Sequence, residues 1–311
     1  MRKAKTQSPK VSLVVVGSVA LDTVITPSER RSNVLGGSVS YACLAASFFS
    51  KVGMVGVIGR DFPGHGIRTY TKAGIDITGL QKADGKTFRW AGEYEADMNN
   101  RKTLSTELNV FAGFEPELPE SYRNSPFLFL ANISPELQIH VLSQVRKPKF
   151  VAVDTMDLWI KTAKSSLARL FNRVNLIMVN DSEARMLSGE SNLARAASSI
   201  LGMGPEYVIV KKGEHGAVLF SRSGRFMVPA FPVDNVLDPT GAGDTFAGGF
   251  MGFLAMSGKV DWDSLRRAML YGSVIASFGV EAFSVERLVV LRRIEIARRL
   301  AAFERMLALP K

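Results

Sequence analysis

Cysteine and histidine are scarce in this chain of 311 residues. Its one cysteine, Cys43, excludes an internal disulfide, and His65, His140 and His215 are scattered singly. Structural zinc sites need several Cys or His ligands at short spacing. The sequence therefore offers no such site, and the lack of disulfides leads us to expect a cytoplasmic protein.

Long apolar runs are also lacking. The run VSLVVV at 11–16 follows a basic start, but it is shorter than the apolar region of a usual signal peptide, and Asp22 follows soon after. No segment approaches the roughly 18 continuous apolar residues of a membrane helix. We expect no membrane association.

Acidic residues are rare only at the two ends of the chain. The net charge is +10, and residues 1–10 carry four basic side chains and no acidic one, while residues 287–311 carry seven basic against two acidic. Nucleic-acid binders gather positive charge along a working surface. Basic ends keep nucleic-acid binding open as a hypothesis, but simple solvation is the favoured interpretation, and we expect no nucleic-acid partner.

What the chain does have is the composition of a packed globular protein, with 46% hydrophobic and 22% charged residues. Strand patterns rich in Val, Ile and Leu recur, several of them apolar on both faces, at 11–16, 54–58, 127–131, 149–153, 175–179, 206–211 and 217–221. Helical patterns lie between many of them, at 38–50, 134–145, 157–172 and 191–202, and the C-terminal third adds a strand at 224–229 and helices at 242–257, 262–278 and 286–307. This alternation predicts an α/β fold with a largely parallel sheet.

The segment 77–106 interrupts this alternation. It places β-favouring residues, among them Phe88, Trp90 and Tyr94, around turn residues. We expect this segment to form most of a β lid over the edge of the sheet, with an ordinary hairpin insertion as the alternative. The predicted organisation is a basic tail at 1–10 and one domain at 11–311.

The most informative motif is DPTGAGDTF at 238–246, which runs into a helical pattern. Its glycines let the backbone turn tightly and point amide N–H groups at one spot, where a helix N-terminus adds positive potential. Such a turn predicts an anion hole. Asp244 lies beside it, where a carboxylate can accept a proton from a hydroxyl; capping of the helix is the alternative role.

Two common nucleotide motifs are excluded. Gly85-Lys86-Thr87 ends like a P-loop, but that motif needs a glycine where this chain has Leu80. After the first strand, Gly17-Ser18-Val19-Ala20 lacks the spaced glycines of a dinucleotide-binding turn. Any nucleotide binds elsewhere.

The segment DPTGAGDTFAGGF at 238–250 closely resembles the C-terminal signature of the ribokinase-like PfkB carbohydrate kinases. Gly36-Gly37 and the helix after them resemble the N-terminal glycine pair of that family, and the resemblance covers about residues 11–290. It implies an ATP-dependent kinase with a Rossmann-type three-layer α/β/α domain and a small β-sheet lid.

For the transfer of the phosphoryl group, the resemblance implies that Asp244 is the catalytic base. Gly241, Ala242 and Gly243 match the anion hole of the family.

The segment NDSE at 180–183 matches the Asn-x-x-Glu motif of the family. A carboxylate is a hard oxygen ligand that can order water around Mg²⁺, so we expect Glu183 to act on the metal and Asn180 to support the phosphates.

The segment KKGEHG at 211–216 resembles the nucleotide-binding turn of the family. We expect ATP beside Lys211, Gly213 and Gly216, and also beside Ser273, which falls at or next to the position where many relatives carry Asn. Asp238 and Thr240 fall near a monovalent-cation site of some relatives, so such a cation is a further candidate.

For the acceptor, Asp22 matches the acidic residue with which relatives bind substrate hydroxyls. Gly36 and Gly37 would admit the substrate close to the backbone, and Asn132 is a further candidate. The glycine pair continues as Ser38-Val39-Ser40, without the Lys and Asn of ribose-specific relatives, which argues against ribose itself.

The leading hypothesis is a kinase that moves the γ-phosphoryl group of ATP to a hydroxyl of a small sugar or sugar-like substrate. The aromatic residues of the lid could instead stack on a nucleobase, which makes a nucleoside kinase the main alternative, followed by a cyclitol kinase. A catalytically silent ligand sensor with the kinase fold is the non-enzyme alternative. A homodimer through the lid is left open.

Overall fold

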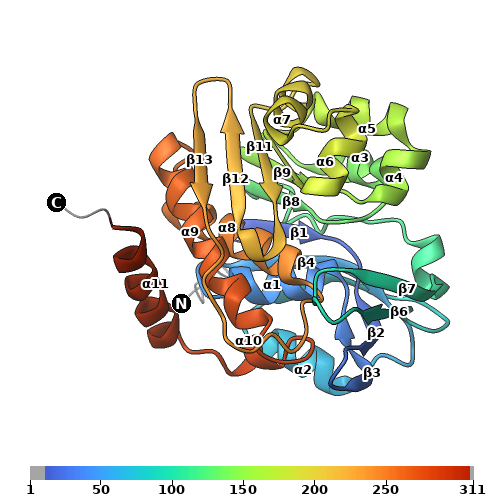
Figure 1. Ribbon diagram of the computed structural model, residues 1–311. Helices are drawn as coiled ribbons and strands as arrows, with labels where there is room; N and C mark the ends of the chain where they lie inside the picture. Colours follow the sequence, from blue (N-terminus) through green and yellow to red (C-terminus); the bar gives the residue numbers. More distant parts are fainter. Residues whose placement is uncertain (1–10, 309–311) are drawn as a thin grey trace, which may run out of the picture.

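The computed structural model describes residues 11–308, which form two β-sheets (Figure 1). The large sheet has nine strands in the order β13-β12-β11-β10-β9-β8-β1-β4-β5. In chain order these are β1 (Leu13–Val16), β4 (Val52–Ile58), β5 (Asp76–Lys82), β8 (Phe127–Leu130), β9 (Phe150–Asp154), β10 (Leu176–Asn180), β11 (Tyr207–Lys211), β12 (Ala217–Ser221) and β13 (Arg225–Val228). The strands from β11 to β5 pair in parallel, and β12 and β13 continue the sheet antiparallel.

Helices cover both faces of this sheet, which is why strands such as β1 and β4 are apolar throughout and fully buried. One face packs against α1 (Ser38–Ser47), α2 (Gly64–Lys72), α8 (Ala242–Ser257), α9 (Trp262–Gly279), α10 (Glu286–Val290) and α11 (Arg293–Leu307). The other packs against α3 (Pro135–Gln144), α4 (Asp157–Thr162), α5 (Lys164–Phe171), α6 (Asp181–Ser188) and α7 (Leu193–Gly202). Short 3-10 turns are η1 (Asn109–Gly113) and η2 (Gly213–His215). The predicted three-layer α/β/α class is confirmed.

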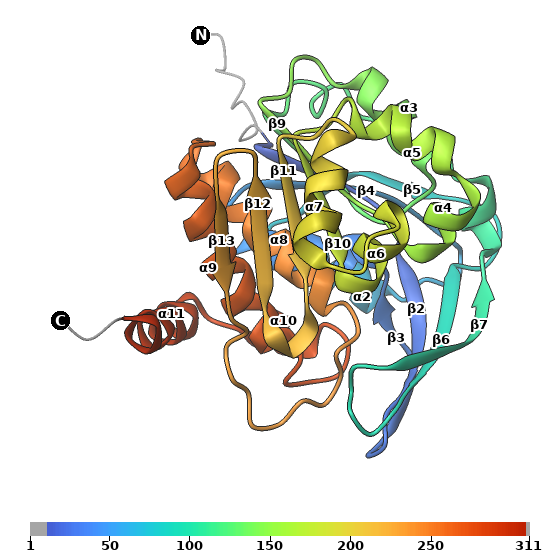
Figure 2. The same cartoon turned by 45° about the horizontal axis from the view of Figure 1, so that its top comes forward.

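A second sheet of four strands, in the order β3-β2-β6-β7, lies beside the carboxyl ends of several strands of the large one (Figure 2). We call it the lid: β2 (Ala20–Ile25), β3 (Arg30–Gly36), β6 (Phe88–Tyr94) and β7 (Arg101–Glu107). Only β6 and β7 come from the segment 77–106, and β5 belongs to the large sheet. The exposed, polar start of β3, with the sequence RRSN, gave no strand signal.

Two of the expected helices are interrupted. The pattern at 157–172 forms α4 and α5, because the backbone leaves the helical region at Ala163, and the pattern at 286–307 forms α10 and α11. The predicted basic tail at 1–10 lies outside the described residues. Within 11–308, each helix is too short or too polar to span a membrane.

Helix α8 is held against α1 by very close contact. A Cβ atom on Gly252 would stand 2.7 Å from the Cα of Ala46, and one on Gly248 would overlap the carbonyl oxygen of Ala42. Both neighbours are backbone atoms, which cannot rotate away. The two glycines therefore set the position of α8, whose first turn carries Asp244.

We predict that Gly248→Ala lowers the free energy of unfolding by about 1–3 kcal/mol, because the added methyl overpacks this contact. Urea unfolding followed by circular dichroism measures it. Gly202→Ala is the matched control: Gly202 ends α7 with no atom within 4 Å of an added Cβ, so the change should be neutral or stabilising. Equal stability of the wild type and Gly248→Ala would contradict the close-contact argument.

Candidate active site

Parallel pairing brings polar side chains from three strands to one edge of the large sheet. β9, β10 and β11 are neighbours and end at Asp154, Asn180 and Lys211. The first turn of α8 reaches the same place, since the Lys211 ammonium lies 3.2 Å from where a Cβ on Gly243 would stand. Ligands of open α/β sheets bind at this edge.

The turn before α8 leaves amide groups free. Gly241 is the N-cap, with a φ of 74°, and no side chain caps the helix. The amide of Ala242 donates to the carbonyl of Pro239, whereas those of Gly241, Gly243 and Asp244 find no acceptor among residues 11–308. Gly241 also packs against the ring of Tyr41, where a Cβ would collide. Free amides at a helix N-terminus form an anion-binding site.

The carboxylate of Asp244 accepts no hydrogen bond from the described residues, so it does not cap α8. Burial raises its pKa to about 7, and the negative charge of Asp154 adds to the rise, while Lys211 and Arg101 oppose it. A carboxylate with this pKa is a better proton acceptor than an ordinary aspartate.

Glu183 and Asn180 form a reciprocal capping box at the start of α6. The Asn180 side chain accepts from the Glu183 amide at 2.8 Å, and the Glu183 carboxylate accepts from the Asn180 amide at 2.7 Å. Burial raises the pKa of Glu183 to about 7, and Asp154 contributes to the rise. The motif thus has a structural role in the helix and faces the charged edge of the sheet.

On the lid, Asp22 of β2 is 3% exposed, and its Oδ1 has no hydrogen-bond partner among the described residues. Burial and, after it, the negative charge of Asp238 raise its pKa to about 7, and the Gly37 amide opposes this rise. Gly36 must lack a side chain, because a Cβ there would overlap the Asp22 carboxylate. The structure therefore brings Asp22, Gly36 and Gly37 together.

Arg101, at the start of β7, is a residue that the sequence analysis missed. Its positive charge opposes the rise in the pKa values of Asp22, Glu183 and Asp244, which come from three different elements. Its guanidinium lies 5.2 Å from the centre of the Trp90 ring. Nothing in the sequence around Arg101 marks it, because its position depends on the pairing of β6 with β7.

Several hydrogen bonds join the lid to the main domain, among them that of Arg89 with Asp61, and two lie at the turns of the candidate active site. The Thr240 hydroxyl donates to the Tyr94 hydroxyl at 3.1 Å, and the Asn99 side chain donates to Glu214 at 3.0 Å. Asn99 belongs to the β6–β7 loop and Glu214 to the predicted nucleotide turn. The lid is therefore closed against both the turn before α8 and the turn after β11.

Other predicted residues have local partners. Gly213 and Gly216 have φ angles of 55° and 82° in the turn between β11 and β12. Ser273 donates to the carbonyl of Pro229 at 3.0 Å, and Asn132 accepts from the indole of Trp159 at 3.1 Å. The hydroxyl of Ser273 and the amide oxygen of Asn132 thus both have protein partners.

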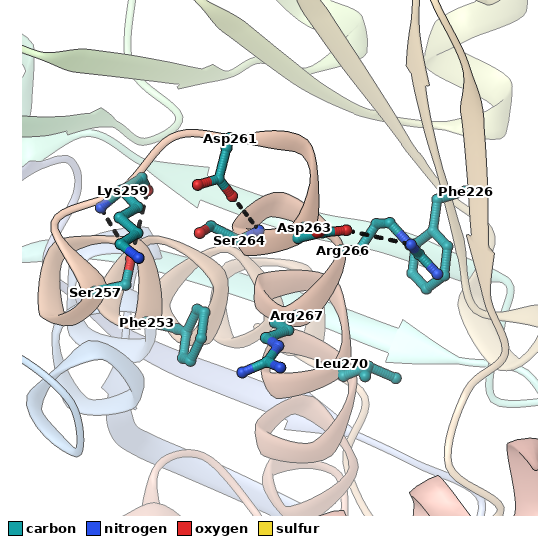
Figure 3. Close-up of a pocket in the computed structure, with 10 residues that line it drawn as sticks. All are labelled: Phe226, Phe253, Ser257, Lys259, Asp261, Asp263, Ser264, Arg266, Arg267 and Leu270. Carbon is teal, nitrogen blue, oxygen red and sulfur yellow. Dashed lines mark hydrogen bonds and ion pairs between the residues drawn. The ribbon is translucent and has the colours of Figure 1, made fainter.

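A hollow of about 750 Å³ lies at the other end of α8, between Ser257 and the start of α9 (Figure 3). There the Asp261 side chain caps α9 by accepting a hydrogen bond from the Ser264 amide. Arg266 forms an ion pair with Asp263 and lies over the ring of Phe226. A helix of 16 residues spans about 24 Å. The hollow is therefore far from Asp244 and is not part of the candidate active site.

Comparison with known proteins adds three findings. The model of the pfkB family carbohydrate kinases matches residues 10–286. The chain is 34% identical over 248 residues to a cytidine kinase of Thermococcus kodakarensis, which covers 78% of this chain and 87% of that kinase. It is 25% identical over 283 residues to a nucleoside kinase of Methanocaldococcus jannaschii, covering 87% and 90% respectively.

Among solved structures, a protein of E. coli assigned as a ribokinase II, in complex with ATP and Mg²⁺, is 18% identical. It superposes with a TM-score of 0.77 over 94% of this chain and 99% of that one. At this identity, the likeness shows the fold alone.

We predict that Asp244→Asn lowers kcat by roughly 10² to 10⁴, the range for loss of a general base, while the affinity for ATP changes much less. Steady-state kinetics with the true acceptor measures kcat, and calorimetry measures ATP binding. The variant must first be shown to be folded. A folded variant that turns over at the wild-type rate would remove Asp244 from the proton transfer.

The pKa of Asp22 predicts a pH dependence of stability. Since its pKa rises from 3.8 to about 7 on folding, the folded protein binds this proton more tightly than the unfolded chain does. Protonation therefore stabilises the folded state at low pH, and this stabilisation is lost as the pH rises through about 7. Asp22→Asn, which cannot ionise, should be more stable than the wild type at pH 8 by a few kcal/mol, and similar to it near pH 4. Urea unfolding at both pH values tests this; a difference that does not grow with pH would contradict it.

Proposed function

The chain belongs to the pfkB family of carbohydrate kinases, and from this premise we propose that its phosphoryl acceptor is a nucleoside. Family membership makes it an ATP-dependent phosphotransferase that acts on a hydroxyl group of a sugar or nucleoside, so the resemblance seen in the sequence is confirmed. The similarity to a cytidine kinase and a nucleoside kinase supports the narrower choice.

On the phosphate side, the free amides at the start of α8 would stabilise the negative charge that develops on the γ-phosphoryl group. Asp244 would accept the proton of the acceptor hydroxyl. Support comes from the missing hydrogen-bond partners of these amides and from the raised pKa of Asp244. The lid hydrogen bonds at Thr240 and Glu214 would keep water away from the transfer.

The residues at this edge fit Mg²⁺. No group of three or more His, Cys, Asp or Glu within 11–308 is arranged to hold a metal by itself, and Mg²⁺ commonly binds through one or two carboxylates, water and substrate phosphates. Glu183 would hold the ion through its water ligands. When bound, Mg²⁺ neutralises charge on the phosphates of ATP.

On the acceptor side, one observation carries the proposal: Asp22 and Trp90 are register partners on neighbouring parallel strands of the lid. Paired residues on such strands point to the same face of the sheet. The orphan oxygen of Asp22 suits a hydroxyl of the sugar, and the indole of Trp90 beside it suits a nucleobase.

The other two aromatic residues of the lid have packing partners. Phe88 stacks on Phe111 with ring centres 5.2 Å apart, and Tyr94 is buried and bonded to Thr240. Trp90 is partly buried, and its indole donates to Thr103 at 3.3 Å. Trp90 also has a partner, since the Arg101 guanidinium lies 5.2 Å from the centre of its ring. It alone of the three is the register partner of Asp22, and for this reason we assign the nucleobase contact to Trp90.

A monovalent cation near Asp238 and a homodimer through the lid stay predictions. Asp238 is 1% exposed and accepts the amides of Thr240 and Ser284, each at 2.8 Å. These bonds shape the loop in which a cation would bind. For the dimer, β7 offers an edge strand whose seven residues are exposed.

We predict that ATP consumption against a panel of sugars, nucleosides and cyclitols is fastest with a nucleoside. Trp90→Ala should raise the KM for that nucleoside by roughly 5-fold to 100-fold through lost stacking, with little change in the KM for ATP. Phe88→Leu is the matched control, since Phe88 packs within the protein. Preference for a free sugar, together with an unchanged KM in Trp90→Ala, would contradict the proposed acceptor.

A further inference from the structure

An ion pair stands at the centre of the candidate active site. The Lys211 ammonium lies 2.5 Å from the Asp154 carboxylate, and the two side chains are only 17% and 6% exposed. Desolvation makes such a buried pair costly, and well-packed apolar residues often stabilise a fold equally well. Stability alone is therefore a weak reason for placing this pair here.

The surroundings of Lys211 point to a function. Burial opposes its charge, but the carboxylates of Asp154, Glu183 and Asp244 together raise its pKa above the ordinary value, so the amine is protonated. The ammonium also lies 3.2 Å from where a Cβ of Gly243 would stand. An anion held by the free amide of Gly243 would therefore lie within reach of this charge.

We propose that Lys211 is the side-chain member of the anion hole and contacts the γ-phosphoryl group during transfer, with Asp154 as its positioning residue. The bond from the γ-phosphorus to the bridging oxygen breaks, and that oxygen leaves with ADP. The acceptor oxygen bonds to the γ-phosphorus, and its proton passes to Asp244. Lys211 keeps its own proton and offsets the charge of the equatorial oxygens.

Asp154 is suited to hold the lysine because it is itself fixed. Its Oδ1 accepts from the Thr155 amide at 2.8 Å, and its carbonyl accepts from the buried side chain of Gln138 at 3.0 Å. The carboxylate of Asp244 accepts no hydrogen bond from the described residues. Without Asp154, Lys211 would be free to pair with Asp244, and that contact would weaken the base.

The proposal rests on the phosphotransferase activity and is independent of the choice of acceptor. Its test therefore uses nucleotide binding, measured by calorimetry with Mg²⁺ for ADP and for a non-hydrolysable ATP analogue. Lys211→Met should weaken binding of the ATP analogue at least 10-fold and leave the affinity for ADP within about 3-fold of the wild type. The reason is that only the analogue has a γ-phosphate. Lys211→Arg should keep the analogue within a few-fold of the wild type.

Lys211→Met leaves Asp154 buried without a partner and can fail to fold. The double variant Lys211→Met/Asp154→Asn removes both charges and avoids this cost. Under the proposal, the folded double variant still binds the analogue at least 10-fold more weakly, and its kcat falls by roughly 10² to 10³.

If the folded double variant binds the analogue and turns over like the wild type, the pair is only structural and the proposal is wrong. If the binding of ADP and of the analogue is weakened equally, the proposal is also wrong, since Lys211 would then contact another part of the nucleotide. Arg146→Met/Glu120→Gln is the matched control. It removes an exposed ion pair beside the start of β9, at the opposite edge of the sheet.

Discussion

The grouping of four buried or partly buried charged side chains at one edge of the large sheet governs the rest of this molecule. Asp154, Glu183, Lys211 and Asp244 come from four different elements, and the charge of Asp154 helps to raise the pKa values of Glu183, Lys211 and Asp244. Three carboxylates with one ammonium leave an excess of negative charge in a poorly hydrated place. Burial, together with that excess of negative charge, raises the pKa values of Asp244 and Glu183. The excess charge also suits a ligand that brings positive charge, such as Mg²⁺.

The lid contributes a second positive charge to the candidate active site. Arg101 comes from the outermost strand of the lid, yet its charge acts on Asp22, Glu183 and Asp244. The hydrogen bonds from Thr240 and Asn99 hold the lid at the position where this is possible. Closure of the lid and the electrostatics of the site are therefore coupled. A closed lid leaves less water around the charged groups, and interactions between charges are stronger where less water is present.

Under the proposed function, the two substrates would meet different parts of the structure. The phosphate side is built from strand ends and the start of α8, which the close contact of α8 with α1 holds in place. The acceptor side is built from the lid, where Asp22 keeps an unpartnered oxygen beside Trp90. A change of acceptor would thus require changes in the lid and leave the phosphate side intact, which agrees with the general rule that function lies in sites placed on a shared fold.

Local patterns in the sequence were enough to predict eight of the nine strands of the large sheet, most helices and the turn before α8, whereas β5 was assigned to the lid. Apolar strands and glycine-rich turns depend on neighbours in the chain, and DPTGAGDTF leads directly into α8. The turn also pointed to Asp244, whereas Asp22 and Glu183 were identified through the resemblance to the family. The lid strands at 20–36, the charge of Arg101 and the partner of Lys211 could not be found in this way. Asp154 and Lys211 are 57 residues apart, and only the parallel pairing of β9, β10 and β11 brings their strand ends together. The sequence determined which residues could carry out the chemistry, and the tertiary structure decided which of them share one buried place, because pairing between distant strands leaves no local pattern.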